Sequence, residues 1–509
     1  MTGDKDVPAA GRPVRESEIF REPPGSGNYS SSIGAAVGIE LFQGRGREQR
    51  VRPAKTIVEP EREVPVLAET DILVVGGGPA GTAAAIAAAR LGADVLLVER
   101  YNHLGGLSTG GLVIWIDRMT DWSGRHIIRG LAEEFVDRLP KDAVAGPPRA
   151  EWGSRDAVTA GYWAQRTAAY HGIVTWSPTI DPERLKLASQ ELVLESGVHL
   201  LLHGLGCAPI MADGAVAGVV FESKEGRLAI RARVTVDCTG DGDIFSRAGA
   251  GADTDTDIEE RDIHHCMNTS WIWGGCDLTR WIAFKTGDAA GFSAFMERGR
   301  AQCGGLFERP FVSWRNDVAL FMGPRLSGYS AIDIQDLTEV EIRSHRLMAQ
   351  HLDVYRAHAP GFEQAFLMLS APQLGVRHSR RLPGVARVTR ERWTDPTPWE
   401  DEIGVSPSLS PKLPLVSVPY GCLVPRSVDG LLVAGRHVSS DPASHSFLRE
   451  IPQCWLTGQA AGIAAALAAA RARSPRDVDP RALQRELLRQ GAYLSPATMM
   501  ALQPAPAAE

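Results

Sequence analysis

The fold of this 509-residue chain is decided at one stretch, Ile72-Leu73-Val74-Val75-Gly76-Gly77-Gly78-Pro79-Ala80-Gly81. Four apolar residues run directly into glycines, and the Ala-rich segment 82–90 follows. A continuous apolar run bounded by glycines is typical of a buried parallel strand, and the Ala-rich segment favours a helix. A second apolar run, 94–98, follows Gly92 and ends at Glu99. The sequence therefore predicts a strand-turn-helix-strand unit and an α/β fold.

The glycines of this turn stand at the first, third and sixth places of a hexapeptide. Gly76 permits a tight turn, Gly78 lets a pyrophosphate approach backbone amides at the helix start, and Gly81 allows close packing of helix on strand. Glu99 lies about 20 positions beyond the first glycine, where an acidic residue accepts hydrogen bonds from the ribose hydroxyls of an adenosine. These spacings predict a dinucleotide site, with NAD and FAD both open at this point.

Four later segments add to this pattern. Leu104-Gly105-Gly106-Leu107-Ser108-Thr109 places a second glycine pair just after Glu99, where a bulky ligand could approach the backbone beyond the pyrophosphate. The others are Val236-Asp237-Cys238-Thr239-Gly240-Asp241-Gly242-Asp243, the buried strand Leu431-Leu432-Val433-Ala434 ending in Gly435-Arg436, and the helix that opens at Ile451-Pro452. Together they favour FAD over NAD.

This set of segments resembles the FAD-dependent oxidoreductase family of the glutathione reductase and fumarate reductase flavoprotein superfamily, over roughly residues 59–467. The resemblance implies a Rossmann-like, discontinuous FAD-binding domain of the glutathione reductase type with an inserted α+β substrate domain. It implies cofactor contacts at Gly76, Gly78, Pro79, Ala80, Gly81, Glu99, Arg100, Gly105, Gly106, Leu107, Ser108, Gly206, Thr239, Gly240, Asp241, Gly435, Arg436 and Ile451.

Candidate catalytic residues lie just upstream of the last helix. His445 and Arg449 stand four residues apart, and members of the family carry such a pair near the reactive face of the flavin. A histidine exchanges a proton near neutral pH, while an arginine fixes a carboxylate or polarises a carbonyl. His437 is a further candidate, with packing under the strand end as its alternative. Arg377 or Arg381 could clamp an anionic substrate, and structural salt bridges are the competing interpretation.

The domain organisation follows from where these motifs fall. We expect an N-terminal extension at 1–55, and a FAD-binding domain assembled from 56–125, 181–255 and 371–475. A substrate or cap domain would comprise 126–180 and 256–370, and a C-terminal helix and tail 476–509. Asp181-Pro182 predicts a helix start, strands are expected at 199–203, 215–222 and 227–237, and Thr338 to Glu341 has the spacing of a capping box that opens a helix to about His358.

Composition sets limits on the partners and the compartment. A formal net charge of −7 gives no bulk attraction to nucleic acid or to a membrane surface. The seven cysteines show no metal or disulfide spacing, and the adjacent His264-His265 do not suit one metal ion, so no metal site is predicted. The start Met1 to Pro8 lacks the pattern of a secretory signal. We expect a cytoplasmic protein with a small-molecule substrate, and a homo-oligomer stays open.

The resulting hypothesis is an FAD-dependent dehydrogenase or oxidase that moves a hydride between a small organic substrate and N5 of the flavin. Two alternatives stay open. One is a flavin monooxygenase, and the other is a flavin-carrying protein that works with a partner or in RNA modification.

Overall fold

The computed structural model describes residues 42–43, 56–254 and 266–503. The predicted N-terminal extension therefore lies almost entirely outside the described residues, as do His264 and His265. The principal helices are α3 (Pro79–Ala89), α4 (Leu131–Asp137), α5 (Ala157–Ala164), α6 (Pro182–Glu195), α7 (Asp243–Arg247), α9 (Leu278–Gly287), α10 (Ala289–Gln302), α11 (Ile334–His358), α12 (Pro442–Leu448), α13 (Ile451–Ala470), α14 (Pro480–Arg489) and α15 (Pro496–Ala501).

The strands fall into one large sheet and several small ones. They are β1 (Phe42–Gln43), β2 (Val66–Val75), β3 (Val95–Glu99), β4 (Val144–Ala145), β5 (Ala169–Tyr170), β6 (Ile173–Val174), β7 (Thr179–Ile180), β8 (His199–Leu202), β9 (Leu205–Ala212), β10 (Ala215–Ser223), β11 (Gly226–Asp237), β12 (Met267–Asn268), β13 (Trp271–Gly274), β14 (Phe311–Val312), β15 (Val318–Phe321), β16 (Leu326–Ser327), β17 (Phe366–Ser370), β18 (Gly375–Val376), β19 (Glu402–Ser406), β20 (Val416–Pro419) and β21 (Leu431–Val433).

The large sheet has the order β8-β3-β2-β11-β10-β9, and β21 also pairs with β11. Strands β8, β3, β2, β11 and β21 run parallel, whereas β10 is antiparallel to both β11 and β9. The mixed α/β fold with a parallel sheet is therefore confirmed. Strand β11 reaches past the hairpin with β10, so that its last residues, Thr235 to Asp237, pair with β21.

The register brings the carboxyl ends of the central strands to one level. Val75 at the end of β2 pairs with Val98 of β3 and with Asp237 of β11, and Asp237 pairs with Val433 of β21. Ligands of open parallel sheets bind just beyond such ends. The segments that follow these strands are the glycine-bearing motifs of the sequence, which are thereby gathered at one edge.

Helices α3 and α13 cover one face of this sheet and pack directly on each other. Both are apolar on every side, as is expected of helices buried all round. A Cβ at Gly458 would lie 2.1 Å from the carbonyl oxygen of Ala80, and a Cβ at Gly462 would lie 2.0 Å from that of Ala84. The two helices touch backbone to backbone, so these glycines serve close helix packing.

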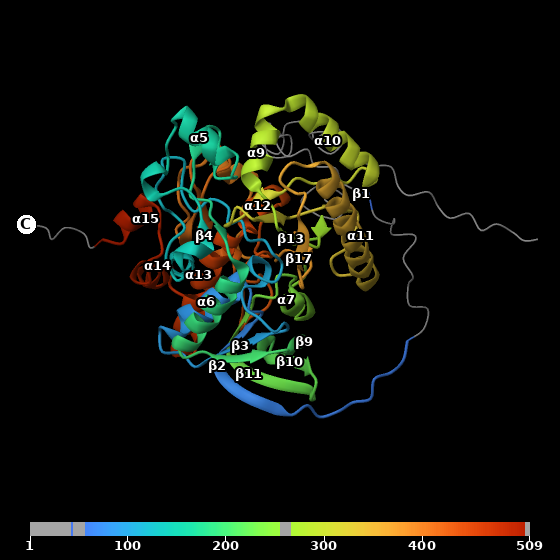
Figure 1. The fold of residues 1–509 in the computed structure, drawn as a ribbon. Coiled ribbons are helices and arrows are strands. Elements are labelled where there is room, and N and C mark those ends of the chain that lie inside the picture. Colours follow the sequence, from blue (N-terminus) through green and yellow to red (C-terminus); the bar gives the residue numbers. More distant parts are fainter. Residues whose placement is uncertain (1–41, 44–55, 255–265, 504–509) are drawn as a thin grey trace, which may run out of the picture.

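A second core lies apart from the large sheet. Its aromatic centre includes Trp271, Trp273 and Trp281, with Tyr355 of α11 packed among them. Strands β14, β15, β13 and β17 form its sheet, and α9, α10 and α11 surround it. Figure 1 shows these three helices together at the end of the molecule opposite β9, β10 and β11. All of its residues fall between 267 and 376, but the predicted domain boundaries stay a prediction.

Two predicted helix starts differ in outcome. Helix α6 is confirmed, since the Asp181 carboxylate accepts hydrogen bonds from the amides of Glu183 and Arg184. The predicted start of α11 at Thr338 is wrong, because the Asp333 side chain caps the helix one turn earlier. No helix of the described residues is both long and apolar enough to span a bilayer.

Candidate functional site

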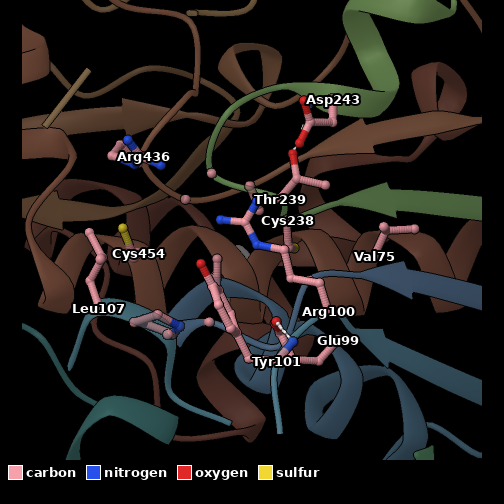
Figure 2. Close-up of a pocket in the computed structure, with 18 of the residues that line it drawn as sticks. Val75, Glu99, Arg100, Tyr101, Leu107, Cys238, Thr239, Asp243, Arg436 and Cys454 are labelled. Carbon is pink, nitrogen blue, oxygen red and sulfur yellow. Dashed lines mark hydrogen bonds between the residues drawn. The ribbon is translucent and has the colours of Figure 1, made fainter. Parts of the chain in front are cut away.

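A cleft opens at the carboxyl ends of β2, β3, β11 and β21, where open parallel sheets bind their ligands. Figure 2 shows Glu99, Arg100 and Tyr101 near one another, with Leu107, Cys454 and Arg436 on another side. Its lining comprises Val75, Gly76, Gly78, Pro79, Ala80, Val98, Glu99, Arg100, Tyr101, Gly106, Leu107, Gly204, Leu205, Gly206, Cys238, Thr239, Gly240, Asp243, Gln373, Ala434, Gly435, Arg436, Arg449, Ile451 and Cys454.

The first glycine turn forms one wall of this cleft. Gly76 has φ of +101°, and a Cβ there would lie 2.4 Å from the carbonyl oxygen of Cys238. A Cβ at Gly81 would lie 1.7 Å from the carbonyl oxygen of Gly76, so helix and turn are in contact. Gly78 differs, because the nearest atom to its Cβ position is the Cα of Gly106 at 3.9 Å. Gly78 therefore faces open space between two glycine segments.

Two helices start at the cleft without a side-chain cap. Gly78 precedes α3 and Glu450 precedes α13, and neither helix has a side-chain hydrogen bond at its start or an acidic residue in its first turn. The first amides of a helix lack intrahelical acceptors and carry partial positive charge. Both helix starts therefore suit anionic or electron-rich ligand groups.

Glu99 is 6% exposed at the end of β3 and holds two backbone segments together. One carboxylate oxygen accepts a hydrogen bond from the amide of Gly77 at 2.6 Å, and the other from the amide of Tyr101 at 2.8 Å. Since each carboxylate oxygen accepts about two hydrogen bonds, capacity remains for ribose hydroxyls. Glu99 is thus a structural clamp as well as a candidate ligand for an adenosine.

The Gly-Asp loop after β11 is fixed by charge. The Asp241 carboxylate accepts hydrogen bonds from Ser379 and from Arg436, each at 2.8 Å. Burial raises the pKa of Asp241, but the nearby Arg436 and Arg100 lower it by more than burial raises it. The pKa of Asp241 therefore lies below its ordinary value. Arg436 also donates to the carbonyl of Val376 at 2.8 Å. This network holds Arg436 at the cleft wall, and Asp241 supports it from behind.

His437 and Asp237 form a buried pair behind the cleft. Their side chains are fully buried, with Nε2 of His437 3.3 Å from the carboxylate. Asp237 also accepts hydrogen bonds from Thr239 and from the amides of Ile244 and Phe245 at the start of α7. His437 does not line the cleft. The pair orders the loop between β11 and α7.

His445 and Arg449 occupy different positions relative to the cleft. His445 is 1% exposed on α12, its ring packed edge-on against that of His378 at 4.9 Å. Arg449 follows α12 and lines the cleft, with its guanidinium 3.1 Å from the Glu450 carboxylate. Burial lowers the pKa of Arg449 to about 10, with Arg377 and Arg325 acting in the same direction and Glu450 against them. Arg449 remains cationic at neutral pH.

Most residues selected from the sequence meet at this cleft. Those that line it are Gly76, Gly78, Pro79, Ala80, Glu99, Arg100, Gly106, Leu107, Gly206, Thr239, Gly240, Gly435, Arg436, Arg449 and Ile451. Those outside its lining are Gly81, Gly105, Ser108, Asp241, His437 and His445. Gly105 still joins the two glycine segments, since its amide donates to the Gly77 carbonyl at 2.8 Å.

Sequence reasoning missed several lining residues, among them Tyr101, Cys238, Gln373 and Cys454. Tyr101 and Cys238 directly adjoin the predicted contacts Arg100 and Thr239, so their place at the cleft could have been predicted from the sequence. Gln373 carried no signal, yet its side-chain oxygen is buried at the cleft without a hydrogen-bond donor. Within 56–254 and 266–503, no group of three or more His, Cys, Asp or Glu side chains is arranged to hold a metal ion.

Comparison with known proteins defines the class. Residues 71–487 match the FAD dependent oxidoreductase family, and the chain belongs to that family. FAD is therefore its cofactor.

The individual relatives are more distant. The chain is 28% identical over 198 residues to a digeranylgeranylglycerophospholipid reductase of Methanocella arvoryzae, covering 39% of this chain and 45% of the relative. It is 30% identical over 190 residues to that of Methanoculleus marisnigri, covering 37% and 43%. The chain thus matches less than half the length of these curated relatives. A geranylgeranyl bacteriochlorophyll reductase-like structure from Thermoplasma acidophilum aligns with a TM-score of 0.40 and 13% identity over 82% of each chain.

Proposed function

We propose that the cleft holds FAD and that the protein moves a hydride between N5 of the flavin and a small organic substrate. The observation that carries this is the meeting of four glycine-bearing segments and two uncapped helix starts at one edge of the parallel sheet. Backbone amides without side-chain acceptors fit a pyrophosphate and a flavin ring better than they fit a compact substrate.

The lining residues would contact the parts of FAD in turn. Glu99 and Arg100 would hold the adenosine, and Gly78 with the start of α3 would receive the pyrophosphate. Leu107, Arg449 and Ile451 would bound the flavin ring. The unsatisfied oxygen of Gln373 would accept a hydrogen bond from a ring or substrate N–H or O–H group. FAD supplies hydride transfer at N5, while the chain supplies binding, orientation and exclusion of water.

Groups of the protein itself would stabilise the charges that develop on substrate and flavin and would transfer the accompanying proton. The Arg449 guanidinium reaches the cleft and would polarise a substrate carbonyl or fix a carboxylate. The start of α13 would stabilise negative charge that develops on the ring as it accepts electrons. His445 stays our candidate for the group that takes or gives the proton that accompanies the hydride. It does not line the cleft, and it lies on the side of the site where His378 and Arg449 are found. His437, enclosed with Asp237, would instead hold the loop.

The test begins with the absorbance spectrum of the purified protein, which should show bound flavin. Anaerobic addition of candidate alcohols, amines and acids should then bleach the flavin with the true substrate. His445→Ala should keep the flavin colour and bleach much more slowly, whereas His199→Ala, at an exposed site on β8, should bleach normally. Unchanged bleaching in His445→Ala would remove His445 from the mechanism.

The same preparation separates the competing functions. NAD(P)H consumption with incorporation of oxygen into the product would replace this proposal with a monooxygenase. Turnover that requires a co-purified protein or RNA would replace it with the partner-dependent class. A folded protein that neither contains nor binds flavin would refute the proposal entirely.

A further inference from the structure

A small sheet in the second half of the chain brings several polar residues onto one face. Strand β12 pairs antiparallel with β16 and with β18, and Met267 is opposite both Leu326 and Val376. Continued by one residue, this register places Arg325 opposite Asn268 and Arg377 opposite Cys266. Directly opposed residues project to the same face of a sheet, as do residues two apart. Arg325 and Arg377 therefore share a face with Asn268 and Cys266.

Arg325 is the most unusual member of this group. It is 6% exposed, and its Nε and Nη1 atoms are buried without a hydrogen-bond acceptor. A buried guanidinium that lacks acceptors is strongly destabilising, and natural proteins rarely keep one without a purpose. None of the described residues provides an acceptor at these two atoms, and an anionic acceptor would make the strongest hydrogen bonds with them.

Arg325 and Arg377 lie close to Arg449, which lines the cleft. Arg325 and Arg377 are each close enough to Arg449 to lower its pKa. The pKa of Arg325 is lowered mainly by burial and in second place by Arg377. The buried Nε of Arg449 likewise has no acceptor. Of the three arginines only Arg449 lines the cleft. Arg377 directly follows Val376, whose carbonyl accepts a hydrogen bond from the cleft-lining Arg436 at 2.8 Å. Arg325 and Arg449 have unused buried donors.

The local charges do not balance. Glu450 pairs with Arg449 at 3.1 Å, and Glu308 is the other carboxylate that acts on Arg325. Burial raises the pKa of the Cys266 thiol, so it remains neutral and cannot serve as the missing anion. Among the described residues, Asp117 also acts on Arg449, but it lies 3.6 Å from Arg118, so these contacts leave one positive charge of the three arginines without a carboxylate of its own. A single carboxylate would restore neutrality and supply the acceptors.

We propose that Arg325, Arg377 and Arg449 form a carboxylate-binding site at the end of the cleft, so that the substrate is a small organic acid. This inference rests on the proposed function, because it assigns the substrate class of the same site. Guanidinium groups match the planar, two-oxygen geometry of a carboxylate. The acid group would be held here while the reacting carbon of the same molecule reaches the flavin.

The experiment uses the FAD-loaded protein and matched pairs of acid and neutral analogue. Benzoate and succinate are compared with benzamide and succinamide as anaerobic titrants, and binding is followed both by the flavin absorbance spectrum and by calorimetry. We expect saturable binding of at least one acid and at least tenfold weaker binding of its amide. Arg325→Met should raise the Kd of the acid at least tenfold. The control Arg280→Met, which removes an exposed ion pair with Glu363, should leave it unchanged.

Stability gives a second, independent readout. Arg325→Met removes a buried charge without full compensation, so the ligand-free variant should melt at the same or a higher temperature than the parent. A merely structural arginine would give a lower melting temperature. Arg325→Lys keeps the charge without the planar fork and should recover only part of the acid affinity.

The outcomes separate this inference from the proposed function. A flavin-containing protein that is bleached by neutral substrates, and whose binding of acids is unaffected by Arg325→Met, overturns the carboxylate site and leaves the hydride-transfer proposal intact. A protein in which no substrate bleaches the flavin refutes the hydride-transfer proposal. In that protein, calorimetric binding of an acid that Arg325→Met weakens would still establish the anion site, and absence of such binding would overturn it.

Discussion

Substitution of Gly462 by Ala tests the backbone contact on which the cleft depends. The new Cβ would lie 2.0 Å from the carbonyl oxygen of Ala84, whereas ordinary contact begins at 3.4 Å. Helices α3 and α13 would have to separate by more than 1 Å, and both helices begin at the cleft wall. Overpacking of this kind costs about 1–3 kcal/mol, while replacing Gly by Ala within a helix returns about 1 kcal/mol.

We therefore expect Gly462→Ala to lower the free energy of unfolding by up to about 2 kcal/mol and to weaken FAD binding. Urea denaturation followed by circular dichroism and a flavin titration measure the two effects. Gly161→Ala is the matched control, because Gly161 is exposed within α5 and its added Cβ meets nothing within 4 Å. That control should be stabilised by up to about 1 kcal/mol. Equal stabilisation of both variants would refute the close helix contact.

Three further changes probe the cleft and its supports. Gly78→Ala should fold normally, because its φ of −70° suits any residue. The variant should lose at least tenfold in FAD affinity, since the methyl group enters the space between two glycine segments. A flavin titration measures this loss, and unchanged affinity would contradict it. Glu99→Gln should lose about 1–3 kcal/mol of stability, because its NH₂ group would face the amide of Gly77 or Tyr101, and unchanged urea unfolding would contradict this. Burial raises the pKa of Asp237, but His437 and donated hydrogen bonds depress it overall, so this carboxylate stabilises the fold above about pH 4 and the contribution is lost as pH falls further. Asp237→Asn should therefore be less stable at pH 7 and show a flatter acid limb, and parallel pH-stability profiles of the two proteins would contradict the assignment.

The sequence predicted the cofactor end of the cleft because that end is made of local signals. A strand, a glycine turn and an acidic strand end stand within 30 residues, and their geometry follows from backbone chemistry. The start of α11 was mispredicted because two capping residues, Asp333 and Thr338, compete, and the Asp333 side chain accepts both first-turn amides.

The opposite end of the cleft could not be predicted in the same way. The pairing of β12 with β16 and β18 brings Arg325 and Arg377 together, and Arg449 comes from the segment that follows α12. The sequence named Arg377 and Arg449 as separate candidates, but it gave no signal that distinguishes Arg325 from the other arginines of the chain. Their proposed joint role depends on proximity and, for Arg325 and Arg449, on buried atoms without acceptors, which are properties of the folded state and leave no trace in residue spacing.

The two ends of the cleft would bind their ligands through different kinds of group. The proposed FAD contacts are largely backbone groups fixed by turns and helix starts, so side-chain changes at the far end should leave cofactor affinity nearly constant. The proposed acid contacts are side chains, Arg325 just before β16, Arg377 just after β18 and Arg449 just after α12, where one substitution alters charge without moving the parallel sheet. Changes at Arg325 or Arg377 would then alter which substrate is oxidised or reduced while the flavin stays in place. We therefore expect substrate range and cofactor binding to be separable by mutation in this protein.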